Sequence, residues 1–168
     1  MDHYKSWPGL NKRLNGFLCE PLQGRISYFL TRYHTVHNAY GRAAIRLDGD
    51  ELVCFSWIDL YRQQRDLNAL WKRTGRCGEW DYQDAELKEK WDQAGIYCEM
   101  DFLSAALEFL NLPIQTALDS ENYLIKIFAI LDRRVGIRTL KTIERSEEFL
   151  RYPDWVKQFY SLRLNFRR

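Results

Sequence analysis

Long apolar runs are absent from this sequence of 168 residues. The most apolar stretch, Tyr123 to Leu131, is interrupted by Lys126 and is shorter than the roughly 18 residues that a membrane span needs. The N-terminal residues MDHYKSWPG also lack the apolar segment of a signal peptide. We therefore expect a cytoplasmic protein without a membrane partner.

Closely spaced cysteines are absent as well. Cys19, Cys54, Cys77 and Cys98 are scattered, which leaves no zinc ribbon and no redox motif and favours reduced thiols. Cys77 follows Arg76, and because a nearby cation lowers the pKa of a thiol, it is the best candidate for a reactive thiol. It has no histidine close in sequence to act as its base.

The catalytic signatures GxGxxG, GxSxG, HExxH and the Walker loop are missing too. His34 and His37 would bind a metal if Asp48 lay near them, or would form a metal-free ribonuclease site with Tyr33 and Arg42. No third metal ligand has a suitable spacing, and two histidines in a polar loop are more often exposed turn residues. We therefore predict no metal, no cofactor and no catalytic residue, and favour a binding protein over an enzyme.

The composition is that of one globular domain. Hydrophobic residues make up 46% of the chain and charged residues 29%, which excludes the low hydrophobicity typical of disorder. No internal repeat, low-complexity tract or flexible linker divides the sequence. We therefore expect a single domain over residues 1–168.

The hydrophobic pattern predicts an α+β fold. Leu10, Leu14 and Phe17 give a first helix its apolar face. Alternating apolar residues then predict three strands, and the Asp48-Gly49-Asp50 turn predicts a hairpin between the last two. We expect a three-stranded antiparallel meander followed by a bundle of about five helices on one face of the sheet. The expected strands cover 25–33, 42–47 and 51–55, and the later helices cover 56–73, 81–95, 101–110, a segment from Asp119 or Ser120 to Gly136, a short one from Thr139 and a last one from Pro153.

The helix that ends before Gly136 should be the centre of the core, because a helix so apolar is normally buried. Asp119 or Ser120 would cap its start, and Gly136 would end it at the C′ position. This segment fixes where the fold is organised without indicating any chemistry.

Charge is segregated along the chain, and the middle is acidic. Residues 1–78 carry 12 basic and 7 acidic side chains (net +5), residues 79–108 carry 2 and 9 (net −7), and residues 109–168 carry 11 and 7 (net +4). Aromatic residues amid carboxylates are typical of interfaces. In the helix expected here, Leu87, Trp91 and Ala94 should face the core. We predict that the partner-facing surface is formed by Trp80, Tyr82, Asp84, Glu86 and Glu89.

A basic cluster supports an alternative, phosphate-binding interpretation. In the last turn of the central helix, Arg133 and Arg134 suit the helix dipole, and one of them should pair with Asp132 or Asp119. We therefore interpret these two arginines as mainly structural. The phosphate-binding alternative would use Arg133, Arg134, Arg138 and Lys141.

Three motifs resemble those of an uncharacterised family of small bacterial and phage proteins. They are an FLCxxLxGRxxY opening from Phe17, a GRAxIxxD hairpin from Gly41 and a DRRxGxRxL signature from Asp132. The resemblance runs from about Trp7 to the C-terminal helix and implies a free-standing bacterial cytosolic protein, without an assigned activity. The charged residues on its motif positions are Arg25, Arg42, Asp132, Arg133, Arg134 and Arg138.

Two functions fit these features. The first is a non-enzymatic protein-binding module, most concretely an immunity protein (antitoxin) whose acidic surface covers the active site of a basic toxin domain. The second is a nucleic-acid-binding protein or a metal-independent nuclease that uses the basic cluster and the hairpin loop.

Overall fold

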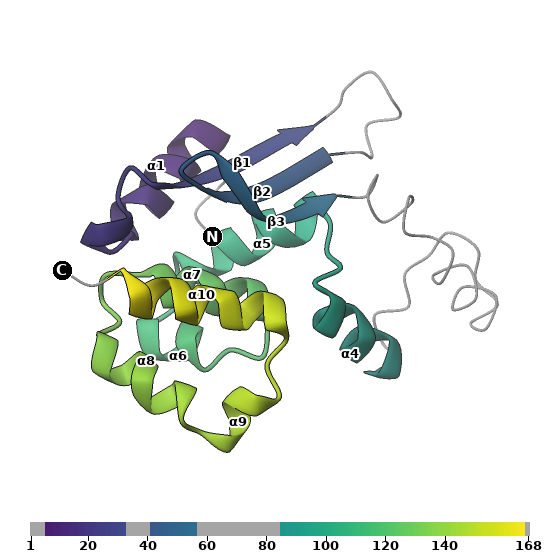
Figure 1. The fold of residues 1–168 in the computed structure, drawn as a ribbon. Helices are drawn as coiled ribbons and strands as arrows, with labels where there is room; N and C mark the ends of the chain where they lie inside the picture. Colours follow the sequence, from purple (N-terminus) through teal and green to yellow (C-terminus); the bar gives the residue numbers. More distant parts are fainter. Residues whose placement is uncertain (1–5, 33–40, 57–84, 167–168) are drawn as a thin grey trace.

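The structure is a computed structural model that describes residues 6–32, 41–56 and 85–166. A helix and a sheet come first, and helices make up the rest of the described chain (Figure 1). The α+β fold expected from the sequence is confirmed. The elements are α1 (Trp7–Phe17), the short 3-10 helix η1 (Glu20–Leu22), β1 (Ile26–Arg32), β2 (Gly41–Leu47), β3 (Asp50–Ser56), α4 (Ala85–Ala94), α5 (Glu99–Phe109), α6 (Ile114–Leu118), α7 (Tyr123–Leu131), α8 (Ile137–Glu144), α9 (Glu147–Leu150) and α10 (Asp154–Asn165).

The sheet is the predicted meander, with strand order β1-β2-β3 and both pairs antiparallel. Asp48 and Gly49 both have positive φ angles, 53° and 96°, as a two-residue type I′ hairpin turn requires. Ser56, the first residue of the helix expected over 56–73, is instead the last residue of β3. The remainder of that expected helix, 57–73, lies outside the described residues.

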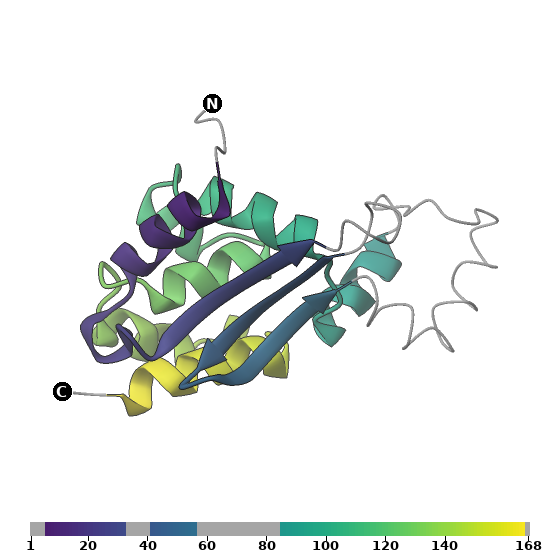
Figure 2. The ribbon, with the colours of Figure 1, turned by 90° about the horizontal axis from the view of Figure 1, so that it is seen from above.

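The outer face of the sheet is covered by its own charged side chains. Seen from above, no described helix lies over this face (Figure 2). Arg42 and Arg46 both pair with Glu51, and the Arg46 guanidinium lies 4.4 Å from the centre of the Phe29 ring. Ala44, between the two arginines on β2, is fully buried. The opposite face of the sheet packs on the helices.

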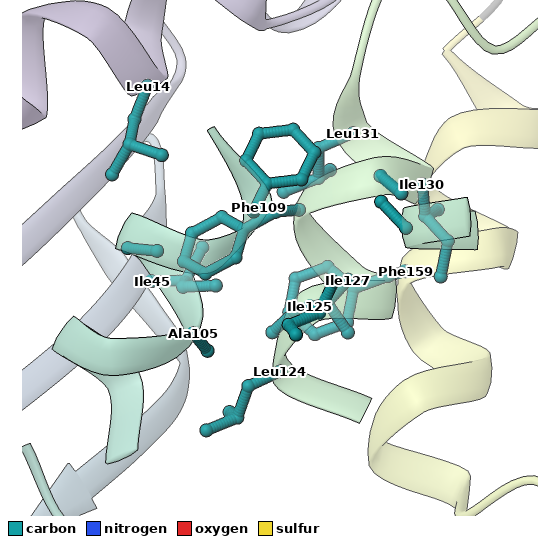
Figure 3. Packing of buried hydrophobic residues seen from close by; sticks show 14 of the residues in the cluster. Leu14, Ile45, Ala105, Phe109, Leu124, Ile125, Ile127, Ile130, Leu131 and Phe159 are labelled. Carbon is teal, nitrogen blue, oxygen red and sulfur yellow. The ribbon is translucent and has the colours of Figure 1, made fainter. Parts of the chain in front are cut away.

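The core is centred on α7, as predicted (Figure 3). Every residue from Leu124 to Leu131 is buried, including Lys126. The ring centre of Phe128 lies 5.3 to 5.5 Å from those of three other aromatic residues, which belong to β1 and α5. These are Tyr28, Phe102 and Phe109.

Both predicted ends of this helix are wrong. Asn122 caps α7, with its side chain accepting from Leu124 N at 3.0 Å, whereas Asp119 is the C-cap of α6. The helix ends at Leu131, because Asp132 has extended backbone (φ −72°, ψ 137°) and forms a β-bridge with Leu18. Gly136 therefore does not end α7.

Other helix ends differ by smaller amounts. Gly136 is the N-cap of α8, which starts at Ile137 instead of Thr139. Helix α5 begins at Glu99, before the expected residue 101, because Cys98 and Asp101 form a capping box. The sequence reading missed α6, which begins directly after Pro113. Helix α10 matches its prediction, with the buried side chains Val156, Phe159 and Tyr160.

Among the helices of the described residues, none has the length and apolar character required to cross a membrane.

Candidate functional site

Helix α4 carries the first described part of the acidic segment and lies at one edge of the described structure (Figure 1). Its Trp91 is buried, as predicted, at 5% exposure. The indole Nε1 of Trp155 on α10 donates to the backbone oxygen of Asp92 at 2.8 Å. Gly95 ends the helix with a φ of 67°. These contacts fix the C-terminal half of α4 against α10.

Of the predicted partner-facing residues, only Glu89 has a described side chain, and it is exposed. Ala94, expected to face the core, is exposed because α4 ends there. Three of the other predicted residues lie outside the described residues: Trp80, Tyr82 and Asp84. The fourth, Glu86, belongs to α4, but its side chain is not described.

Two further polar side chains of α4 contact neighbouring elements. Asp92 accepts a hydrogen bond from the Tyr97 hydroxyl at 2.6 Å. Burial, and secondly this bond to a carboxylate, raise the pKa of Tyr97. The Gln93 amide donates to the backbone oxygen of Arg151 at 3.1 Å, which joins α4 to the turn between α9 and α10. The described acidic surface of α4 is therefore attached to a rigid support.

The arginine motif lies at a junction between the end of α1 and the end of α7. Cys19 N donates to Leu131 O at 3.0 Å, and Arg133 N donates to Phe17 O at 2.8 Å. These two bonds flank the bridge between Leu18 and Asp132. The segment after α7 is thus held against the end of α1.

Arg134 makes the predicted ion pair, and its partner is Asp132. The Asp132 side chain has 0% exposure, and Arg134 donates to both its oxygens, with Nε at 3.1 Å from each and Nη2 at 2.7 Å from Oδ2. The Arg134 guanidinium also lies 4.4 Å from the centre of the Phe17 ring. Arg134 therefore holds the buried Asp132 carboxylate, although it lies beyond α7 and not in its last turn.

The cation that closes α7 is Arg163, which the sequence reading missed. Arg163 is buried at 4% exposure, and it donates from Nε to Ile130 O at 2.9 Å and from Nη2 to Val135 O at 2.8 Å. Helix ends leave carbonyls such as that of Ile130 without intrahelical partners, whereas Val135 lies in the turn that follows α7. Its spacing from Val156 and Phe159 places Arg163 on the buried side of α10, and this was the available signal.

The remaining cations of the predicted cluster are exposed or partly exposed to solvent. Arg133 and Arg138 are exposed, and Lys141 is partly exposed. Arg138 and Lys141 belong to α8, whereas Arg134 is held at the junction by Asp132. The four predicted phosphate-binding residues therefore differ in the element that carries them and in whether a carboxylate pairs with them.

Residues 6–164, almost the whole chain, match the model of one protein family. The chain belongs to the SF0329 protein family. No curated protein and no solved structure matches it. The family match has nearly the extent of the resemblance inferred from the three sequence motifs.

In this member of the SF0329 protein family, the buried amine of Lys126 joins three helices. Its Nζ donates to Leu118 O of α6 at 2.9 Å and to the Tyr152 hydroxyl at 3.0 Å, and Tyr152 donates to Glu148 at 2.7 Å. Burial lowers the pKa of Lys126, an effect partly opposed by Glu148 and Asp119. Lys126 is only 3% exposed, so its amine stabilises the packing of these helices.

Lys126→Met should alter the pH dependence of stability. Because the pKa of Lys126 is lowered in the folded protein, the unfolded chain binds more protons between that pKa and about 10.4. The free energy of unfolding of the wild type, relative to the variant, should therefore rise as the pH increases through this window and be constant below it. Urea titrations at several pH values would measure this difference, with exposed Lys12→Met as the control. A difference that stays flat with pH would show that folding does not lower the pKa of Lys126.

The candidate metal and thiol sites of this SF0329 family member lie mostly outside the described residues, which omit Tyr33, His34, His37 and Cys77. Asp48 pairs with Arg25. Within the described ranges, no group of three or more His, Cys, Asp or Glu residues is placed to hold a metal ion. Burial raises the pKa of the Cys98 thiol to about 12, with Asp101 adding to the effect, so this thiol is not activated.

Proposed function

We propose that this protein is a non-enzymatic protein-binding module, most concretely a bacterial immunity protein that binds and neutralises a cognate toxin domain. The observation that supports the proposal is the exposed Glu89 on α4, in a segment of net charge −7 over residues 79–108. The helix is anchored through Trp91, Asp92 and Gln93. Binding a partner on its outer side therefore costs little conformational entropy, because the helix is already held in place.

The proposed surface combines two kinds of side chain with different roles. Carboxylates at Glu86 and Glu89 would attract a basic partner and raise the association rate, because long-range charge steers the encounter. Trp80 and Tyr82 would supply the aromatic anchors that carry most of the affinity at interfaces. A partner of this chemistry is a basic protein, and a toxin nuclease domain is the concrete case.

Reversing two charges on α4, with Glu86→Lys and Glu89→Lys together, should slow association with the basic partner by roughly 10-fold or more at low salt, while the fold is retained. Surface plasmon resonance at several salt concentrations would measure the rate. Glu108→Lys with Glu121→Lys reverses the same charge at exposed positions outside α4 and should change the rate much less. Equal association rates for the wild type and the α4 variant would remove this surface from the proposal.

The function itself is tested through the neighbouring genes. If an adjacent reading frame encodes a toxin domain, co-expression with this protein should restore growth of a bacterial host, and the purified pair should form a complex. Co-expression that leaves the toxicity unchanged, with both proteins folded and abundant, would reject the immunity role.

The nucleic-acid alternative is weakened in the form that the sequence suggested. Arg134, one of its four residues, is neutralised by the buried Asp132 carboxylate. The nuclease version relies on His34 and His37, which lie outside the described residues. What supports phosphate binding is the separate position of Arg138 and Lys141 on α8.

A further inference from the structure

Helix α8 carries a stripe of cations opposite its buried side. Leu140 is fully buried, and Ile137 and Ile143 pack partly buried against the core. At about 100° per residue, three cations lie within about 60° of one another on the other side of the helix. This α8 stripe consists of Arg138 and Lys141 of α8 and of Arg145, the C-cap residue that follows it.

The positive charge of the α8 stripe is not neutralised within the described structure. Arg138 and Arg145 are exposed and Lys141 is partly exposed, and none of the three forms an ion pair with a carboxylate of the described residues. Exposed Arg133 adds a fourth cation just before α8, while the nearby Asp132 is already paired with Arg134. The helix lies at the far end of the helical layer from the sheet (Figure 1).

We propose that the α8 stripe binds the phosphate backbone of a nucleic acid without reading its sequence. From Arg138 to Arg145 the helix rises about 10 Å, at about 1.5 Å per residue. One strand of B-DNA carries about three phosphates over that length, at roughly 3.4 Å each along the helix axis. Three cations at this spacing therefore match a short run of phosphates, and they contact the backbone and not the base edges.

A membrane surface fits the α8 stripe less well than a nucleic acid does. A helix that lies on a bilayer inserts its apolar side chains between the lipids. The apolar side chains of α8 instead pack on the core of this protein, and the exposed residues between the cations are Thr139, Thr142 and Glu144. The stripe therefore offers charge without an apolar anchor, as backbone binding requires.

The test is a salt titration with defined probes: a labelled DNA duplex of about two helical turns (roughly 20 bp) and a single-stranded RNA of similar length, followed by fluorescence anisotropy. The triple variant Arg138→Gln, Lys141→Gln and Arg145→Gln should lower the slope of log K against log salt by about 2.7 on the duplex or about 2.1 on the single strand. Which probe binds more tightly identifies the preferred nucleic acid. The matched control, Lys12→Gln, Lys90→Gln and Arg151→Gln, removes the same charge elsewhere and should keep the wild-type slope.

Three results would overturn the proposal: no binding of either probe by the wild type, an equal loss in the control, or tighter binding to phosphatidylglycerol vesicles than to both nucleic acids. Thermal unfolding would check that each variant is folded. If the triple variant is unfolded, the single change Arg145→Gln should still lower the slope by about 0.9 on the duplex, and an unchanged slope would then reject the stripe. The experiment uses no protein partner and leaves the carboxylates of α4 unchanged, so its outcome is independent of the proposed protein-binding function.

Discussion

Replacing Phe128 by alanine should lower the free energy of unfolding by about 3–5 kcal/mol, the usual cost of truncating a buried aromatic side chain. Phe128 is 2% exposed and packs on rings from both β1 and α5. Its removal would leave a cavity where the sheet and the helices meet. Leu131→Ala, at the end of the same helix, should cost about 2–5 kcal/mol for the same reason.

Chemical denaturation would measure both changes through the midpoint and slope of the transition. Leu150→Ala is the matched control, because Leu150 is 74% exposed and truncating it should alter the free energy by less than about 0.5 kcal/mol. If the midpoints of Phe128→Ala and Leu131→Ala coincide with the wild type, α7 is peripheral to the core and the architecture argued here is incorrect.

Arg163→Met should cost about 2–4 kcal/mol of stability. Methionine retains much of the apolar stem but cannot donate a hydrogen bond. The backbone oxygens of Ile130 and Val135 would therefore be left buried without the donor that Arg163 provides. Each unsatisfied buried acceptor costs about 1–3 kcal/mol. Arg163→Lys should recover only part of this loss, because an ammonium lacks the planar fork that reaches two separate carbonyls.

The control for Arg163 is Arg133→Met, at an exposed arginine beside the same junction. Denaturation curves would give the change in stability, and hydrogen exchange would show faster exchange at the C-terminal end of α7 in the Arg163 variants. If Arg133→Met destabilises the protein as much as Arg163→Met does, the closing contact of α7 has been assigned to the wrong arginine.

The parts of the fold that the sequence predicted are those encoded by neighbouring residues. The turn at Asp48 and Gly49 needs only the left-handed backbone that these two residues tolerate. The apolar run of α7 reveals its burial by composition alone, and Leu10 and Leu14 define a helix face by their spacing.

The parts that the sequence did not predict depend on distant partners. Gly136 and Arg133 looked like a helix terminus, yet the bridge between Leu18 and Asp132 ends α7 earlier. The cation that satisfies the end of α7 comes from α10, and no local pattern links the two. The partner-facing surface was inferred from composition, and of its residues the structure describes only the side chain of Glu89.

The closure of α7 from both termini has a consequence for biosynthesis. Its last carbonyls are satisfied by Cys19 N, near the beginning of the chain, and by Arg163, near the end. A domain generally folds as a unit. Here α1 and the sheet emerge early, but the central helix receives its final contact only when α10 has been made. A nascent chain that stalls after α9 would therefore lack the Arg163 donor for the Ile130 carbonyl at the end of this apolar helix.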